Sequence, residues 1–96
     1  MITVTYSHEG QRYKISVKGH AGEAEPGKDI VCAAASGILW SLYASLEKYC
    51  DDFSADMRPG DSTLTAQGPL VETRFETIME GYRWLHQNYP EYVQIK

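Results

Sequence analysis

The sequence predicts an α+β fold in which two helices pack on one face of a mainly antiparallel sheet, in the order β-β-α-β-β-α-β. Three observations predict it. Four short segments alternate apolar and polar residues, as half-buried strands do, and two longer segments place apolar residues three or four positions apart, as amphipathic helices do. Glycine and proline mark breaks between these segments. At 96 residues the chain is expected to form one domain, 1–96.

A β-hairpin is predicted at the start of the chain. Ile2, Val4 and Tyr6 alternate with polar residues, and the same alternation resumes after a four-residue break. Strands are therefore expected near 2–8 and 12–19. The start of the chain has neither the basic residues nor the apolar run of a signal peptide, so we expect a cytoplasmic protein.

A long helix is predicted from residue 30 to about residue 50, with Asp29 as its N-cap. The stretch 30–46 carries no charge and lies at the lower edge of the length that spans a bilayer. Its serines and glycine favour a buried core helix, so we expect no membrane association. The helix has one apolar stripe, formed by Ala35, Leu39, Leu42, Leu46 and Tyr49.

The two cysteines are expected to remain thiols. Cys32 and Cys50 lie on one predicted helix, about 27 Å apart along its axis, which is too far for a disulfide. Two thiols fit the reducing environment of the cytoplasm.

The second half of the chain predicts another hairpin, another helix and a last edge strand. Residues 51–57 and 62–67 alternate around a turn at 58–61, Gly68-Pro69 opens the helix, and 92–95 adds the edge strand. The residues of the hairpin expected to face inward are Phe53, Ala55, Met57, Leu64 and Ala66. The apolar stripe of the helix is expected to be Phe75, Ile78, Met79, Tyr82 and Leu85.

Composition and charge narrow the classes of partner. The formal net charge is −4 and the sequence pI is about 5.2, so the chain offers no basic face to a nucleic-acid backbone. We therefore expect no nucleic-acid partner, and a basic protein suits the acidic surface better. No close pair of histidine and cysteine predicts a zinc site, and no cofactor is expected.

The residue types that carry chemistry gather around Cys32 and His20. Cys32 lies in the predicted first turn of a helix, where unpaired N–H groups and the helix dipole favour thiolate over thiol and could later hold an oxyanion. His20 leaves the preceding strand within reach of that sulfur, as an ion-pair partner or a general base. The simpler alternative is that Cys32 packs in the core and His20 lies in solvent.

The run GHAGEAEPGKDIVCAAAS, residues 19–36, resembles the signature of the ribosomal-processing cysteine protease family Prp. That signature has Gly-His-Ala, a variable loop, and then Gly-x-Asp-x-x-Cys at the start of a helix. The similarity extends to the expected order of elements and to the closing Tyr-Pro-Glu-Tyr-Val at 89–93, and therefore covers most of the chain.

The resemblance implies a thiol protease. His20 and Cys32 carry over as its catalytic dyad, and the segment 22–28, which includes Gly22 and Gly27, as a gate that rearranges around the substrate. Members of the family form homodimers and remove an N-terminal extension from large-subunit ribosomal protein number twenty-seven, so this precursor is the expected substrate. Two alternatives are the same protease acting on a phage structural protein, and a non-catalytic peptide-binding dimer associated with ribosome assembly.

Further side chains are supporting candidates. Asp29 either caps the helix by accepting an N–H from Val31 or Cys32, which we favour, or orients His20. The hydroxyl of Ser36, one helical turn beyond Cys32, either assists the oxyanion or a substrate amide, or bonds back to the Cys32 carbonyl. Four helix aromatics either receive an apolar peptide or belong to the core: Trp40, Tyr43, Tyr82 and Trp84.

Overall fold

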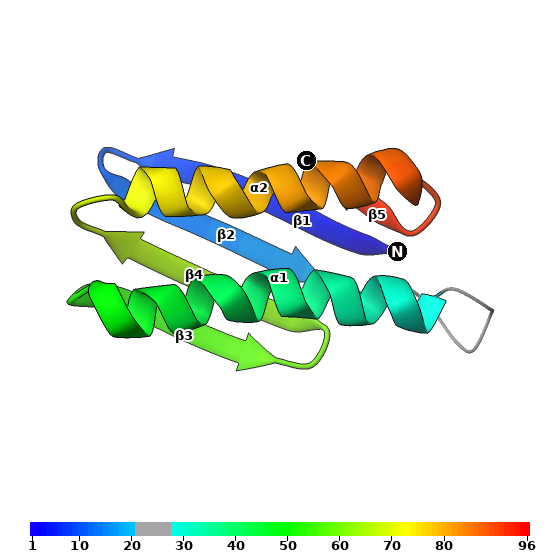
Figure 1. Ribbon diagram of the computed structural model, residues 1–96, viewed down its shortest axis with the longest axis horizontal. Coiled ribbons are helices and arrows are strands. Elements are labelled where there is room, and N and C mark those ends of the chain that lie inside the picture. Colours follow the sequence, from blue (N-terminus) through cyan, green and yellow to red (C-terminus); the bar gives the residue numbers. More distant parts are fainter. Residues whose placement is uncertain (21–27) are drawn as a thin grey trace.

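The computed structural model describes residues 1–20 and 28–96, and of residues 28 and 29 it describes the backbone alone. Its elements follow the predicted order (Figure 1). They are β1 (Ile2–Glu9), β2 (Arg12–Lys18), α1 (Lys28–Tyr49), β3 (Asp52–Arg58), β4 (Asp61–Gln67), α2 (Val71–Asn88) and β5 (Val93–Ile95). Each lies within a few residues of the segment that its hydrophobic spacing predicts.

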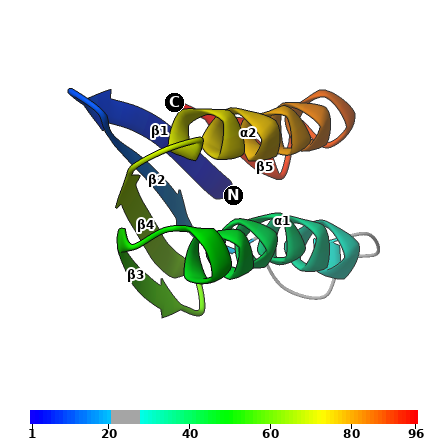
Figure 2. The ribbon, with the colours of Figure 1, turned by 60° about the vertical axis from the view of Figure 1, so that its left-hand side comes forward.

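The five strands form one sheet in the order β3-β4-β2-β1-β5. Neighbouring strands are antiparallel, except that β1 and β5 run parallel. Both helices lie on the same face of this sheet, as the turned view in Figure 2 shows. The predicted fold class, two helices on one face of a mainly antiparallel sheet, is therefore confirmed.

The core lies between the sheet and the two helices. From the helices it takes five residues each: Val31, Ala35, Leu39, Leu42 and Leu46 of α1, and Val71, Phe75, Met79, Tyr82 and Leu85 of α2. They pack against the inward residues of β1, β2 and β4. The segment Ile30–Tyr49 is long and apolar enough to cross a membrane, and in this fold the five core residues of α1 are buried against the sheet and α2.

Two residues that the spacing placed in the core are exposed instead. Tyr49 is the last residue of α1 and is 61% exposed, and the Arg74 guanidinium lies 4.6 Å from the centre of its ring. Ala55 is exposed because β3 is the outermost strand of the sheet, where the helices give less cover. The two-residue repeat of a strand predicts which face of the sheet a side chain takes. Whether that side chain is buried depends on the elements that pack on that face.

The helix α1 begins at Lys28, two residues before its predicted start. Asp29 therefore lies inside the first turn rather than in front of it, and Cys32 lies about one turn inside the helix. Because assignments of helix ends differ by a residue or two, a capping role for Asp29 stays a prediction. Cys50 follows the other end of α1, and the two cysteines do not form a disulfide, as predicted.

A buried hydrogen bond joins the two helices. The Tyr82 hydroxyl of α2 donates to the Ala35 carbonyl of α1 at 2.9 Å, and Tyr82 is inaccessible to solvent. Burial raises the pKa of this hydroxyl, which therefore stays protonated as a donor. Ala35 follows Cys32 by one turn, so the bond helps to set the position of the part of α1 that carries the thiol.

We expect Tyr82→Phe to lower the free energy of unfolding by about 1 kcal/mol, because the variant loses one buried hydrogen bond and little apolar contact. In a domain of this size that loss lowers the melting temperature by about 4–8 °C, measured by circular dichroism. The control is Tyr49→Phe, at an exposed position, which should change stability by less than about 0.5 kcal/mol. Equal melting temperatures for the two variants would show that the hydrogen bond from Tyr82 to Ala35 does not stabilise the fold.

Candidate active site

Backbone contacts hold the chain where it leaves β2. Gly19 has φ 98°, a conformation that favours glycine, and a side chain there would overlap the Met1 carbonyl. The Gly19 amide donates to the Gly60 carbonyl at 2.8 Å, and the Met1 nitrogen donates to the His20 carbonyl at 2.6 Å. The chain is thus tied to the β3–β4 turn at Gly19 and to the start of β1 at His20.

The imidazole of His20 packs on Gly60. This glycine and Pro59 connect β3 to β4, and its φ of 72° again favours glycine. A Cβ at position 60 would overlap two atoms of the His20 ring, Nε2 and Cε1, so the imidazole can lie here only beside a glycine. The turn predicted at 58–61 therefore has a second role, which is to support the histidine.

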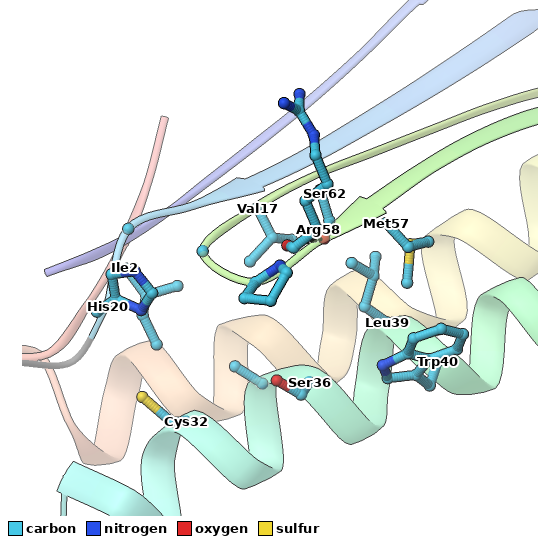
Figure 3. Close-up of a pocket in the computed structure, with 14 residues that line it drawn as sticks. Ile2, Val17, His20, Cys32, Ser36, Leu39, Trp40, Met57, Arg58 and Ser62 are labelled. Carbon is cyan, nitrogen blue, oxygen red and sulfur yellow. Dashed lines mark hydrogen bonds between the residues drawn. The ribbon is translucent and has the colours of Figure 1, made fainter.

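Cys32 of α1 lines the same cavity as His20. Figure 3 shows its sulfur directed from the helix toward the side of the cavity on which His20 lies. Cys32 is partly buried. The first turn of α1 carries backbone N–H groups without intrahelical partners, and such groups stabilise the negative charge that develops when a thiolate attacks a carbonyl.

A cavity of about 360 Å³ lies between these two residues. Its walls come from α1, from the ends of β1 and β2, and from the β3–β4 turn (Figure 3). The apolar part of the lining includes Val17, Leu39, Trp40, Met57 and Pro59. The side chains that add polar groups beside His20 and Cys32 are those of Ser36, Arg58 and Ser62.

The other predicted site residues are only partly described. Ser36 is exposed and lines the cavity one helical turn after Cys32. The gate residues Gly22 and Gly27 lie outside the described residues, and so does the side chain of Asp29. Of the four helix aromatics, Trp40 lines the cavity and Tyr82 belongs to the core.

Sequence reasoning missed the wall of the cavity opposite α1. Pro59 and Gly60 were predicted only to reverse the chain, and Met57 only to face inward. Their place in the wall of the cavity that His20 also lines depends on the pairing of β2 with β4, which brings Lys18 opposite Asp61. The alternation of apolar and polar residues predicts β2 and β4 as strands but does not predict that they pair. No local sequence pattern therefore predicts this wall of the cavity.

Charge around the cavity is largely compensated. Arg58 at its rim is ion-paired with Asp56 at 3.0 Å and with Asp61 at 3.3 Å, and all three side chains are exposed. Within residues 1–20 and 28–96, no three histidine, cysteine, aspartate or glutamate side chains gather into a metal-binding cluster. The reactive side chains that line the cavity are the thiol of Cys32 and the imidazole of His20.

Comparison with known proteins identifies relatives along the whole chain. Residues 1–94 match the family model described as cysteine protease Prp. Over its full length the chain is 29% identical to the ribosomal processing cysteine protease Prp of Mycoplasma pneumoniae, of which it covers 94%. Over 81% of its length it is 35% identical to the protein of the same name from Mycoplasma genitalium, of which it covers 81%.

Solved structures share the fold over the whole chain. The SMU.848 protein of Streptococcus mutans is 30% identical, with a TM-score of 0.77, and 92% of it is covered. The ribosomal processing protease Prp of Staphylococcus aureus, solved in complex with a substrate peptide, is 19% identical, with a TM-score of 0.83, and 98% of it is covered. At that identity the second likeness shows the fold alone.

We expect Gly60→Ala to displace the His20 imidazole and to slow any reaction that needs it by about 10- to 100-fold, because small displacements of a catalytic group carry large costs. The measurement is the rate of Cys32 alkylation by iodoacetamide near neutral pH, read by peptide mass spectrometry.

Gly10→Ala is the matched control for this substitution. Gly10 also has a positive φ, 61°, in a hairpin turn, but a Cβ there meets no atom within 4 Å. Both variants should lose roughly 1 kcal/mol of stability from the left-handed backbone, and only Gly60→Ala should slow alkylation. If the two variants react equally fast, the contact with His20 has no functional role.

Proposed function

Because the chain belongs to the cysteine protease Prp family, we propose that it is an endopeptidase with Cys32 as its nucleophile and His20 as its general base. The observation that carries this proposal is the cavity into which β2 and α1 each bring one of the two residues. A cysteine that served only for packing would need no imidazole in the wall of the same cavity.

In the proposed reaction the Cys32 sulfur attacks the carbonyl carbon of the scissile peptide bond, and its proton passes to His20. The backbone amides at the start of α1 hold the resulting oxyanion. His20 then donates the proton to the departing amine, and the carbon–nitrogen bond breaks to leave a thioester on Cys32. Water attacks the thioester while His20 accepts its proton, and the acid product and the thiol are released.

Four further residues support this chemistry in the proposal. Ser36, exposed in the cavity one turn after Cys32, donates its hydroxyl to the oxyanion or to a substrate amide. Asp29 orders the start of the helix, since a carboxylate is favoured in a first turn. Gly22 and Gly27 belong to the segment that we propose opens and closes around the substrate.

We propose that the substrate is the precursor of large-subunit ribosomal protein number twenty-seven, which is cut in the cytoplasm by a homodimer of this chain. The relatives named as ribosomal processing proteases support this choice of substrate. Leu39, Trp40 and Met57 give the cavity an apolar wall that suits apolar side chains of a peptide substrate. An acidic chain of net charge −4 also suits a basic ribosomal protein.

We expect iodoacetamide to alkylate Cys32 at least roughly tenfold faster than Cys50 near neutral pH, and His20→Ala to remove that advantage. Cys50 is an internal control, because its thiol lies against the carbonyls of Asp52 and Gln67, at 3.5 and 3.6 Å. A Cys32 that reacts no faster than Cys50, with or without a candidate substrate peptide, would favour the non-catalytic binding module.

We expect the chain to cut a synthetic peptide that covers the N-terminal extension of the ribosomal protein precursor, at a single bond identified by mass spectrometry. His20→Ala should lower the rate by about 10²–10⁴-fold, as the loss of general acid–base catalysis does. Cys32→Ala should abolish cleavage, and a scrambled peptide of the same composition should stay intact. If Cys32 shows His20-dependent alkylation but this peptide is not cut, the protease has another client.

A further inference from the structure

The two helices leave a groove of about 320 Å³ between them. In Figure 1 α1 and α2 lie side by side and run in opposite directions, and the groove lies where the second half of α1 adjoins the first half of α2. A hydrogen bond from Arg74 to Ser45 joins the helices at this place. None of the described residues that line the groove also lines the candidate active site, so the groove is a separate feature of the molecule.

The lining of the groove combines apolar side chains with one positive charge. Leu42, Leu70 and Ile78 supply the apolar part, and four serine and threonine side chains add hydroxyls. Arg74 is the only charged residue among the lining residues that the structure describes. Small-molecule sites commonly have this composition, an apolar wall with a few polar groups in fixed places. The groove is therefore complementary to a molecule that has an apolar body and one negative charge.

Arg74 is held in place without an acidic partner. Its Nη1 donates to the Ser45 hydroxyl at 2.7 Å, and its guanidinium lies 4.6 Å from the centre of the Tyr49 ring. The other three arginines of the chain each form an ion pair, whereas within residues 1–20 and 28–96 Arg74 forms none. A guanidinium has five N–H donors, and a carboxylate can accept two of them side by side. Because the side chain is already positioned, binding an anion costs it little conformational freedom.

Leu70 lies at the groove in an unfavourable conformation. It is the N-cap of α2, with φ 65° and no side-chain capping bond, and its side chain is 65% exposed. A leucine rarely adopts a positive φ, and N-cap positions favour serine, threonine, aspartate, asparagine or glycine. Neither the backbone nor burial within the chain favours a leucine here. An apolar ligand in the groove would cover this side chain, and backbone strain of this kind is common at ligand sites.

The size of the groove favours a small molecule over a helix or strand of another protein. At Gly81 the helices approach so closely that a Cβ would lie 3.2 Å from Ile38 Cδ1, so the groove cannot continue past this contact. At its other end Tyr49 is the last residue of α1, and its ring packs against Arg74. The volume is near the lower limit for small-molecule sites, roughly 300 Å³.

We propose that the groove binds a small amphipathic carboxylate, with the carboxylate on the Arg74 guanidinium and the aliphatic chain against Leu42, Leu70 and Ile78. This binding site goes beyond the protease activity and does not rest on it, because the groove shares no described residue with the candidate active site.

Octanoate is the probe for this site, and octanol is its neutral counterpart. In amide NMR spectra of the full chain we expect octanoate to shift the signals of the groove residues. Octanol should bind at least about tenfold more weakly, because it lacks the charge that strengthens a hydrogen bond to arginine. Equal binding of the two, or octanoate shifts confined to other residues, overturns the proposal. Groove signals that instead move with protein concentration alone would assign the groove to a second copy of the chain, and also overturn it.

Arg74→Gln should weaken octanoate binding by at least about tenfold, because the charged partner of the carboxylate is lost. The matched control is Arg83→Gln, which removes an arginine of the same helix that does not line the groove and should bind octanoate as the parent chain does. A folded Arg74→Gln that binds octanoate as tightly as the control overturns the proposal. The comparison of octanoate with octanol uses the parent chain, so it decides the question even if Arg74→Gln does not fold.

Leu70→Gly should weaken octanoate binding several-fold and yet melt at no lower temperature than the parent chain. Glycine adopts a positive φ without strain, and the exposed leucine side chain contributes little to the core. Binding is measured by the same NMR titration and melting by circular dichroism. An unchanged affinity would overturn the placement of the aliphatic chain against Leu70.

Discussion

The pairing of β2 with β4 is the constraint on which the rest of the structure depends. It joins the two hairpins into one sheet, and its register places Lys18 opposite Asp61, so that the end of β2 meets the turn that follows β3. The hydrogen bond from Gly19 to Gly60 and the packing of His20 on Gly60 both follow from that alignment. A shift by one residue would turn the side chains of β4 to the other face and move the turn away from the imidazole.

The position of the Cys32 thiol depends on a second constraint, which is the rotation of α1 about its own axis. Burial of the α1 stripe and the bond from Tyr82 to Ala35 set that rotation. Cys32, Ser36 and Trp40 are spaced by four residues, so they form one row along the helix, beside the buried stripe. Once the stripe packs on the sheet, this row faces the ends of β2 and β3, and a nucleophile, a hydroxyl and an apolar wall line the same cavity.

The same geometry places the cavity beside the outer strand of the sheet. Met57 of β3 lies in the wall of the cavity, and Trp40, which lines the same wall, is half exposed. The two helices cover β1, β2 and β4 well, whereas Ala55 on the helix side of β3 stays exposed. Contiguous apolar surface of this kind commonly marks a site that binds another molecule, and the proposed function assigns it to the peptide substrate.

By itself, the sequence determined the elements and their order, the apolar stripe of each helix, and the nearness of Cys32 to a helix start, because hydrophobic period and turn residues act over a few positions. It also carried the Gly-His-Ala and Gly-x-Asp-x-x-Cys pattern that indicates the family. Only the tertiary structure decided the strand order, the support of His20 by Gly60, and the exposure of Tyr49 and Ala55. Those features depend on which strands and helices become neighbours, and that choice comes from packing summed over the whole core rather than from any local pattern.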